Sequence, residues 1–244
     1  MKKVLVFQHI EIEDLGLLKS LFKKENIFLK YIKLYDGDFI PDNLEEYSLM
    51  ISLGGSMNTW MEDEYPWLKK EKKAIRKFVI DLNKPFIGLC LGCQLLGEVL
   101  GGEIEKSKKT ELGFCKISLN SDKDIDPIFK NFPQNFDVFQ WHSYEVTNLD
   151  NANICILGAS ETTPIQLFRY KDNAYGIQFH IETEKETIRN WCSEKNYRKE
   201  LQEKIGLNAL ESIEKDQEKL LKDINKLCSI FFFNIIKYFL NSEN

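Results

Sequence analysis

Residues 84–100 constrain the fold of this chain more than any other stretch, because an apolar run turns directly into a helical pattern. Pro85–Leu89 is short, apolar and bounded by polar residues, which is typical of a fully buried strand. Gln94–Leu100 then repeats leucine and valine at helical spacing. The sequence therefore predicts a strand that passes into a helix with almost no loop between them.

The junction itself reads Gly88-x-Cys90-x-Gly92, the pattern of a nucleophile elbow. Glycines suit the two flanking positions, because a Cβ in so tight a turn would strike the neighbouring backbone. The apex residue lies at the start of the helix, where the helix dipole and the free amides favour a thiolate. A buried structural cysteine is the commoner role for an isolated residue of this type, but the paired glycines favour a nucleophilic Cys90.

Cys90 also forms a Cys-x-x-Cys pair with Cys93, which leaves a redox function as an alternative. No proline lies between the two cysteines, and the glycines already have a geometric explanation. The pair therefore favours the redox alternative only weakly.

The overall composition narrows the class of protein. The chain has 244 residues, 29% of them charged, and a net charge of −5, which is typical of a globular protein and opposes binding to nucleic acid. Its six cysteines follow no disulfide spacing, so we expect reduced thiols and a cytoplasmic protein. Residues 230–240 are apolar but too short to span a bilayer, so no membrane is expected as a partner.

Strands and helices alternate through the first hundred residues, which predicts an α/β fold with a parallel sheet covered on both faces. The expected strands are Val4–Phe7, Phe28–Leu34, Leu49–Leu53 and Pro85–Leu89, and the expected helices between them are Leu15–Lys24 and Trp67–Leu82. Ligands of such sheets bind at the carboxyl ends of the strands. Gly54-Gly55 and Cys90 both follow strands, so we expect them to face one site.

The pattern changes after Gly101-Gly102. Short strands are expected at Glu111–Leu119, Phe136–Gln140, Ile154–Ala159, Ile165–Tyr170 and Ala174–Phe179, as antiparallel or mixed additions to the sheet. The pattern is helical from residue 184 onward, with a charged surface helix at Leu210–Asn225 and a final helix at Leu227–Leu240. We expect residues 1–190 to form the main domain and residues 191–244 a helical extension packed on it.

A cysteine nucleophile needs a base, and the base needs an orienting group. Among the three histidines, His180 ends an apolar strand and is followed two residues later by Glu182. Residues i and i+2 of an extended segment point to the same face. The two side chains are therefore predicted to hydrogen-bond as base and carboxylate, although a histidine at a strand end is more often structural.

Four motifs, in order over residues 3–190, make the chain resemble the class I (triad-type) glutamine amidotransferases. The likeness is strongest to stand-alone proteins similar to the glutaminase part of GMP synthase. The motifs are Gly54-Gly55, Gly88–Gln94, Gln140–Ser143 and Phe179–Glu182. The resemblance implies a flavodoxin-like mixed, mainly parallel sheet with helices on both faces.

The resemblance also implies roles for named residues. Cys90 would be the nucleophile, His180 the base and Glu182 its orienting carboxylate. The oxyanion hole would use the backbone of Gly54, Gly55 and Leu91, and the substrate-binding residues would be Gln94, Trp141, His142 and Ser143. The substrate would be glutamine or another γ-glutamyl compound, with neither a cofactor nor a metal, and a synthetase partner is left open.

The sequence departs from the family pattern at several positions. Ile181 replaces a proline between His180 and Glu182, and His142-Ser-Tyr-Glu145 differs from the His-x-Asp form of the nearest relatives. The second departure leaves substrate identity open between glutamine and γ-glutamyl amines or peptides. A non-catalytic binding relative is the third alternative, and the intact cysteine, histidine and glutamate oppose it.

Overall fold

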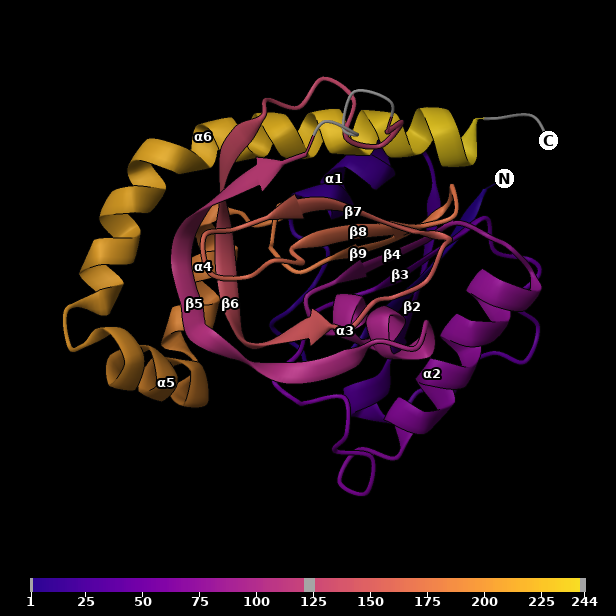
Figure 1. The fold of residues 1–244 in the computed structure, drawn as a ribbon, viewed down its shortest axis with the longest axis horizontal. Helices are drawn as coiled ribbons and strands as arrows, with labels where there is room; N and C mark the ends of the chain where they lie inside the picture. Colours follow the sequence, from indigo (N-terminus) through magenta and orange to yellow (C-terminus); the bar gives the residue numbers. More distant parts are fainter. Residues whose placement is uncertain (1, 121–125, 242–244) are drawn as a thin grey trace.

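A single curved sheet with helices on both faces forms the body of the protein (Figure 1). The computed structural model describes residues 2–120 and 126–241. The nine strands have the order β2-β1-β3-β4-β9-β8-β7-β5-β6. Their bounds are β1 Lys3–Gln8, β2 Phe28–Lys33, β3 Leu49–Ser52, β4 Phe86–Leu89, β5 Glu103–Leu119, β6 Asn135–Thr147, β7 Ile154–Ala159, β8 Leu167–Tyr170 and β9 Ala174–Ile177.

The sheet has a parallel half and an antiparallel half. Strands β2, β1, β3, β4 and β9 pair in parallel, whereas β9, β8, β7, β5 and β6 pair antiparallel in turn. The predicted α/β fold with a mixed sheet is confirmed, and so is the expectation that the strands after residue 102 add to it antiparallel. Strand β4, which leads to Cys90, lies in the interior of the sheet.

Successive side chains of the central strands point to opposite faces of the sheet, and each face carries an apolar layer. Val4 and Val6 of β1 pack in one cluster with helices α1 (Leu17–Lys24) and α6 (Ala209–Ile235). Leu5 and Phe7 pack in the other cluster with α2 (Trp67–Arg76) and α3 (Leu91–Val99). Because successive strand residues face opposite ways, four consecutive apolar residues supply both layers.

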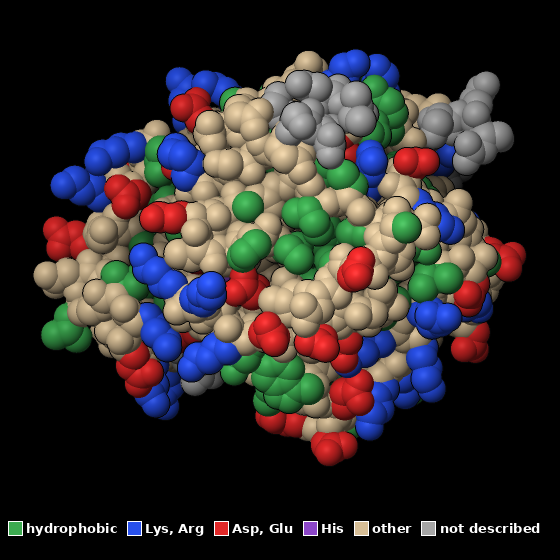
Figure 2. Space-filling view, in the orientation of Figure 1, with side chains coloured by type: hydrophobic (Ala, Val, Ile, Leu, Met, Phe, Trp, Pro, Cys, Tyr) green, Lys and Arg blue, Asp and Glu red, His purple; other side chains and the backbone are tan. Residues whose placement is uncertain are grey.

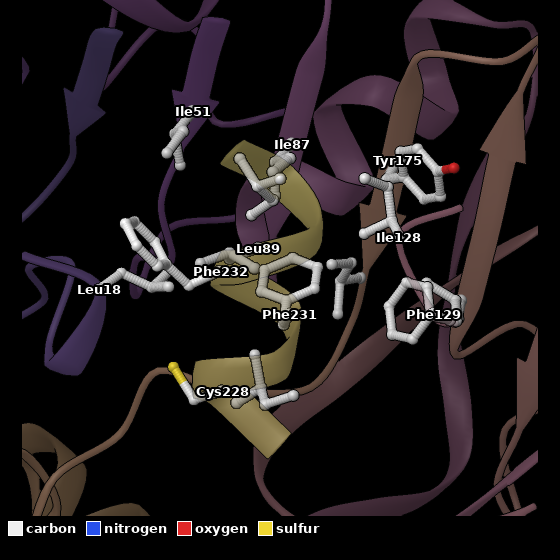
Figure 3. Close-up of a cluster of buried hydrophobic side chains, with 14 of the residues drawn as sticks. Leu18, Ile51, Ile87, Leu89, Ile128, Phe129, Tyr175, Cys228, Phe231 and Phe232 are labelled. Carbon is white, nitrogen blue, oxygen red and sulfur yellow. The ribbon is translucent and has the colours of Figure 1, made fainter. Parts of the chain in front are cut away.

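Helix α6 replaces the two helices expected near the C-terminus. It runs from Ala209 to Ile235 without a break, and a π-helical turn extends it over Ile236–Leu240. No proline or glycine interrupts this stretch, so nothing in the sequence forces a break. Its C-terminal half packs Cys228, Phe231 and Phe232 onto the sheet (Figure 3).

Strands β5 and β6 form a long ribbon that curls beyond the rest of the sheet (Figure 1). The sequence predicted only Glu111–Leu119 of β5, because residues 103–110 are rich in charge and carry no apolar alternation. Pairing with β6 holds this charged half extended. Helices α4 (Lys185–Ser193) and α5 (Lys195–Ile205) pack beside the ribbon through Phe139 and Trp141 of β6.

The surface carries charges of both signs. Figure 2 shows acidic and basic side chains interspersed on one face, without a basic stripe of the kind that tracks a nucleic-acid backbone. Among the helices of the described residues, none combines the length and apolar character needed to cross a membrane.

Candidate active site

Cys90 lies at the point where β4 ends and α3 begins. Its backbone has φ 50°, a strained left-handed conformation for a residue other than glycine. Its amide donates a hydrogen bond of 2.8 Å to the Ile177 carbonyl of the neighbouring strand, which holds the turn. A Cβ at Gly88 would lie 2.3 Å from the Gly92 carbonyl oxygen, and one at Gly92 would lie 2.2 Å from the Ser52 carbonyl oxygen. Both flanking glycines are therefore required by close backbone approach.

His180 lies next to this cysteine and is tied to Glu182. Its Nδ1 is 2.7 Å from Oε1 of Glu182, and both side chains are almost fully buried. Burial alone would lower the pKa of His180, but the Glu182 carboxylate and a hydrogen bond with the Cys90 thiol outweigh it, so the pKa is raised well above its usual value. With Nδ1 engaged by Glu182, the other ring nitrogen is the one left to face the thiol.

Two neighbours fix the position of the His180 ring. The His180 amide donates a 2.9 Å hydrogen bond to the Phe139 carbonyl of β6. Trp191 of α4 meets the imidazole edge-on, with 4.7 Å between the ring centroids. The ring therefore rests on the antiparallel half of the sheet and on a C-terminal helix, although its partner Cys90 belongs to the parallel half.

A cavity of about 530 Å³ opens above Cys90. Its lining includes Gly55, Leu91, Gln94 and His180, and also the segment 141–144 at the substrate position predicted from the sequence. The described residues that line it include no lysine or arginine but four glutamates: Glu11, Glu13, Glu194 and Glu200. The cavity has the size of a small-molecule site.

Two backbone amides at this cavity are left without an acceptor by the part of the chain that the structure describes. Leu91 is the first residue of α3, so its amide precedes the first intrahelical hydrogen bond. Among the hydrogen bonds of the described residues, none uses the amide of Gly55. The carbonyl of Gly54, in contrast, accepts a 2.8 Å hydrogen bond from Nδ1 of His9.

Comparison with known proteins assigns the family. The family model described as "Glutamine amidotransferase class-I" matches residues 38–197. The chain belongs to this family. A glutamine amidotransferase from Thermotoga maritima, solved as a crystal structure, is 32% identical and superposes with a TM-score of 0.85 over 97% of this chain and 98% of that one.

The curated relatives of the chain include GMP synthases and an amidotransferase-like protein. The glutamine-hydrolysing GMP synthase subunit of Sulfurisphaera tokodaii is 34% identical over 63% of this chain and 79% of its own length. The amidotransferase-like protein YfeJ of Salmonella typhimurium is 27% identical over 74% of this chain and 75% of its own. The match to GMP synthase of Thermosipho melanesiensis spans only 21% of that longer protein, at 36% identity.

The four residues that the amidotransferase resemblance assigned to substrate binding all line the cavity, but not all point freely into it. Gln94 donates to the Tyr144 carbonyl at 3.0 Å. The Trp141 indole donates to Glu200 at 2.9 Å, and the Ser143 hydroxyl donates to the same carboxylate at 3.3 Å. Through Glu200, helix α5 thus holds residues 141–143 of β6 in place.

The ring of His142 lines the cavity, but both of its nitrogens are engaged by the protein. Its Nε2 is 2.9 Å from the Glu111 carboxylate and its Nδ1 is 3.1 Å from the Tyr144 carbonyl. Burial raises the pKa of Glu111, but hydrogen bonds from His142, Ser160 and Thr162 outweigh it and lower the pKa to about 2. His142 is therefore held by a carboxylate of β5.

No sequence pattern indicated that Glu13 and helix α5 help to line the cavity. Glu13 is 5% exposed, accepts a hydrogen bond from the Tyr197 hydroxyl and lies beside Gly54 and the His180 ring. Burial raises the pKa of Glu13, although the neighbouring His180 and Tyr197 partly offset it. Residues 13 and 197 are far apart along the chain, and no local pattern connects them.

The third histidine, His9, lies beneath the Gly54-Gly55 turn and is completely buried. Its Nε2 is 3.0 Å from Oε2 of Glu71, and the Oε1 atom of that carboxylate accepts a 2.7 Å hydrogen bond from the Ser52 hydroxyl. Trp67 stacks on the imidazole at 5.3 Å. Burial lowers the pKa of His9, but the Glu71 carboxylate outweighs it and the pKa is raised.

Proposed function

We propose that this protein hydrolyses the side-chain amide of glutamine to glutamate and ammonia through a thioester on Cys90. One observation carries the proposal: a cysteine strained at a strand–helix turn shares a cavity with a histidine that is hydrogen-bonded to a buried glutamate. This is the arrangement of an activated nucleophile, its base and an orienting group. Class I family membership supports it.

In the proposed reaction, His180 takes the proton of the Cys90 thiol, and the thiolate adds to the γ-amide carbon. The carbonyl electrons move onto oxygen, and they return when the C–N bond breaks. His180 gives its proton to the departing nitrogen, so ammonia leaves and a γ-glutamyl thioester remains. Water, deprotonated by His180, then attacks the thioester and releases glutamate and the thiol. Glu182 holds the imidazole in the required tautomer throughout.

The proposed oxyanion hole consists of the amides of Leu91 and Gly55. Both lie at the cavity, and neither has an acceptor among the described residues. Donors of this kind typically contribute about 3–4 kcal/mol each to transition-state stabilisation. Gln94 and the segment from Trp141 to Ser143 would hold the amino acid part of the substrate.

A γ-glutamyl amine or peptide hydrolase is the second candidate, and helix α5 favours it. Tyr197 and Glu200 bring α5 to the rim of the cavity, next to Glu194 at the end of α4. Glu200 lies beyond the residues that the family model matches. A glutaminase that passes ammonia to a synthetase needs an open route to its partner, whereas a helix over the cavity suits a protein that selects its own leaving group.

The test is glutamate release from glutamine and from a panel of γ-glutamyl amides, with ammonia or amine release measured alongside. Intact-mass measurement after treatment with a glutamine-like diazo-ketone reports whether Cys90 reacts. An adduct with slow glutamine hydrolysis supports an amidotransferase that awaits a partner, and brisk hydrolysis of substituted γ-glutamyl amides but not of glutamine supports the second candidate. A folded protein that forms no adduct at Cys90 would contradict both.

A further inference from the structure

The buried pair of His9 and Glu71 has no part in the proton transfers described above, yet it contacts the Gly54–Gly55 turn at the same cavity. Both side chains are 0% exposed. A buried ion pair of this kind is costly to form, since each group loses its hydration. Three elements supply the pair and the serine that hydrogen-bonds to it: β1 leads into His9, α2 carries Glu71, and β3 ends with Ser52.

The hydrogen-bond partners of His9 determine where its protons lie. The Gly54 carbonyl can only accept, so Nδ1 carries a hydrogen and donates it. Nε2 faces a carboxylate that already accepts from Ser52, so the second proton is shared with Glu71. Neither ring nitrogen is free to exchange a proton with a substrate. The ring is a fixed donor.

The planarity of the peptide bond transmits this contact to the cavity. The carbonyl of Gly54 and the amide of Gly55 belong to one peptide unit and point in opposite directions. Because the carbonyl is held toward His9, the Gly55 amide is directed away from it, and Gly55 lines the cavity above Cys90. A flanking pair of glycines has little intrinsic preference for this orientation, so an external contact has to set it.

We infer that His9, held by Glu71, is a positioning residue that orients and polarises the Gly54–Gly55 peptide so that the Gly55 amide stabilises the oxyanion that forms on the substrate carbonyl when Cys90 attacks it. This role rests on the proposed thioester chemistry and adds a group to it. A hydrogen bond to the carbonyl withdraws electron density from the peptide and makes its amide a stronger donor, as in other hydrogen-bond chains.

Two double variants isolate this single hydrogen bond. His9→Leu with Glu71→Gln removes the donor without leaving an unpaired carboxylate buried. His9→Asn with Glu71→Gln keeps a side-chain amide near the place of Nδ1. Glu71→Gln alone is the parent control, and thermal melting shows whether each variant folds. Turnover is measured with glutamine and with γ-glutamyl p-nitroanilide.

A second reaction separates positioning from general damage to the site. Iodoacetamide alkylates Cys90 by displacing iodide, so it uses the thiolate but forms no oxyanion. The His9→Leu double variant should lose about 10²–10³-fold in kcat, the effect of one oxyanion donor, with KM little changed. Its alkylation rate should match that of the parent, and the His9→Asn double variant should recover most of the kcat.

Equal turnover in the two double variants would overturn the inference. A parallel loss of alkylation and turnover would also overturn it, because it would show that His9 supports the structure as a whole. If the unmodified protein is alkylated at Cys90 but hydrolyses neither substrate, the proposed function fails first and the inference fails with it.

Discussion

Two buried histidine–glutamate pairs flank the reactive turn, and they differ in what the second ring nitrogen faces. In the pair of His180 and Glu182 that nitrogen faces the thiol of Cys90. In the pair of His9 and Glu71 both nitrogens are taken by acceptors of the protein itself. In the proposed reaction, the same two residue types therefore make a proton carrier in one place and a fixed donor in the other.

This difference shows that the pairing alone does not define a base. A carboxylate orients the imidazole in both cases. Only a ring nitrogen that can exchange a proton with a reacting group, however, can take part in acid–base chemistry. The third pair, of His142 and Glu111, resembles that of His9, because the Tyr144 carbonyl occupies its other nitrogen.

Replacing Cys90 should have the largest effect. Cys90→Ala is expected to reduce glutamate release to background, because it removes the nucleophile beside His180. Cys93→Ala should keep most activity: Cys93 is fully buried, and burial raises its pKa well above the usual value. Glutamate release by the two folded variants decides the matter. Equal loss in both would revive the redox interpretation of the cysteine pair.

Glu182→Gln should follow, with kcat lower by up to about 10⁴-fold, the loss seen when the orienting carboxylate of a serine-protease triad becomes an amide. A thiol is intrinsically more nucleophilic, so the loss here is expected at or below that figure. Steady-state turnover, with circular dichroism as a check of folding, provides the measurement. A smaller loss than in Glu71→Gln would reverse the roles given to the two pairs.

The pair of His142 and Glu111 should make the free energy of unfolding depend on pH in the acid range. The pKa of Glu111 is about 2 in the folded protein and about 4.5 when unperturbed. The carboxylate therefore stabilises the fold fully above about pH 4.5 and loses this contribution as the pH falls toward 2, by at most about 3 kcal/mol. Urea unfolding between pH 6 and pH 2 should show a steeper decline in the unmodified protein than in Glu111→Gln. Glu105→Gln, at an exposed position of the same strand, should track the unmodified protein.

Ser52→Ala should have the smallest effect. It removes one hydrogen bond to Glu71 and leaves that carboxylate held by His9. The free energy of unfolding should fall by about 1–2 kcal/mol, with turnover reduced only a few-fold. Ser20→Ala on the exposed side of α1 is the matched control and should change stability by less than about 0.5 kcal/mol. A collapse of turnover in Ser52→Ala with stability unchanged would place Ser52 itself in the reaction.

The predicted strands show where local patterns suffice. Strand β7 was predicted at its observed bounds and β1, β2, β3 and β4 within a residue or two. All except β2 are apolar runs closed by polar residues, and β2 is a mostly apolar run interrupted by Lys30. The charged half of β5 was missed, since only its partner β6 keeps it extended. The division of α6 into two helices was wrong because its change from charged to apolar reflects a change of surroundings along one helix.

The sequence by itself determined the elbow at Cys90 and the adjacency of His180 to Glu182. Both are local: the turn needs glycines two residues either side of the cysteine, and residues two apart in an extended segment share a face. Only the tertiary structure decided that Glu71 lies against His9, 62 residues away, and that Tyr197 lies against Glu13, 184 residues away. Such contacts depend on how helices α2 and α5 pack around the sheet, and packing is a property of whole surfaces that no short pattern encodes.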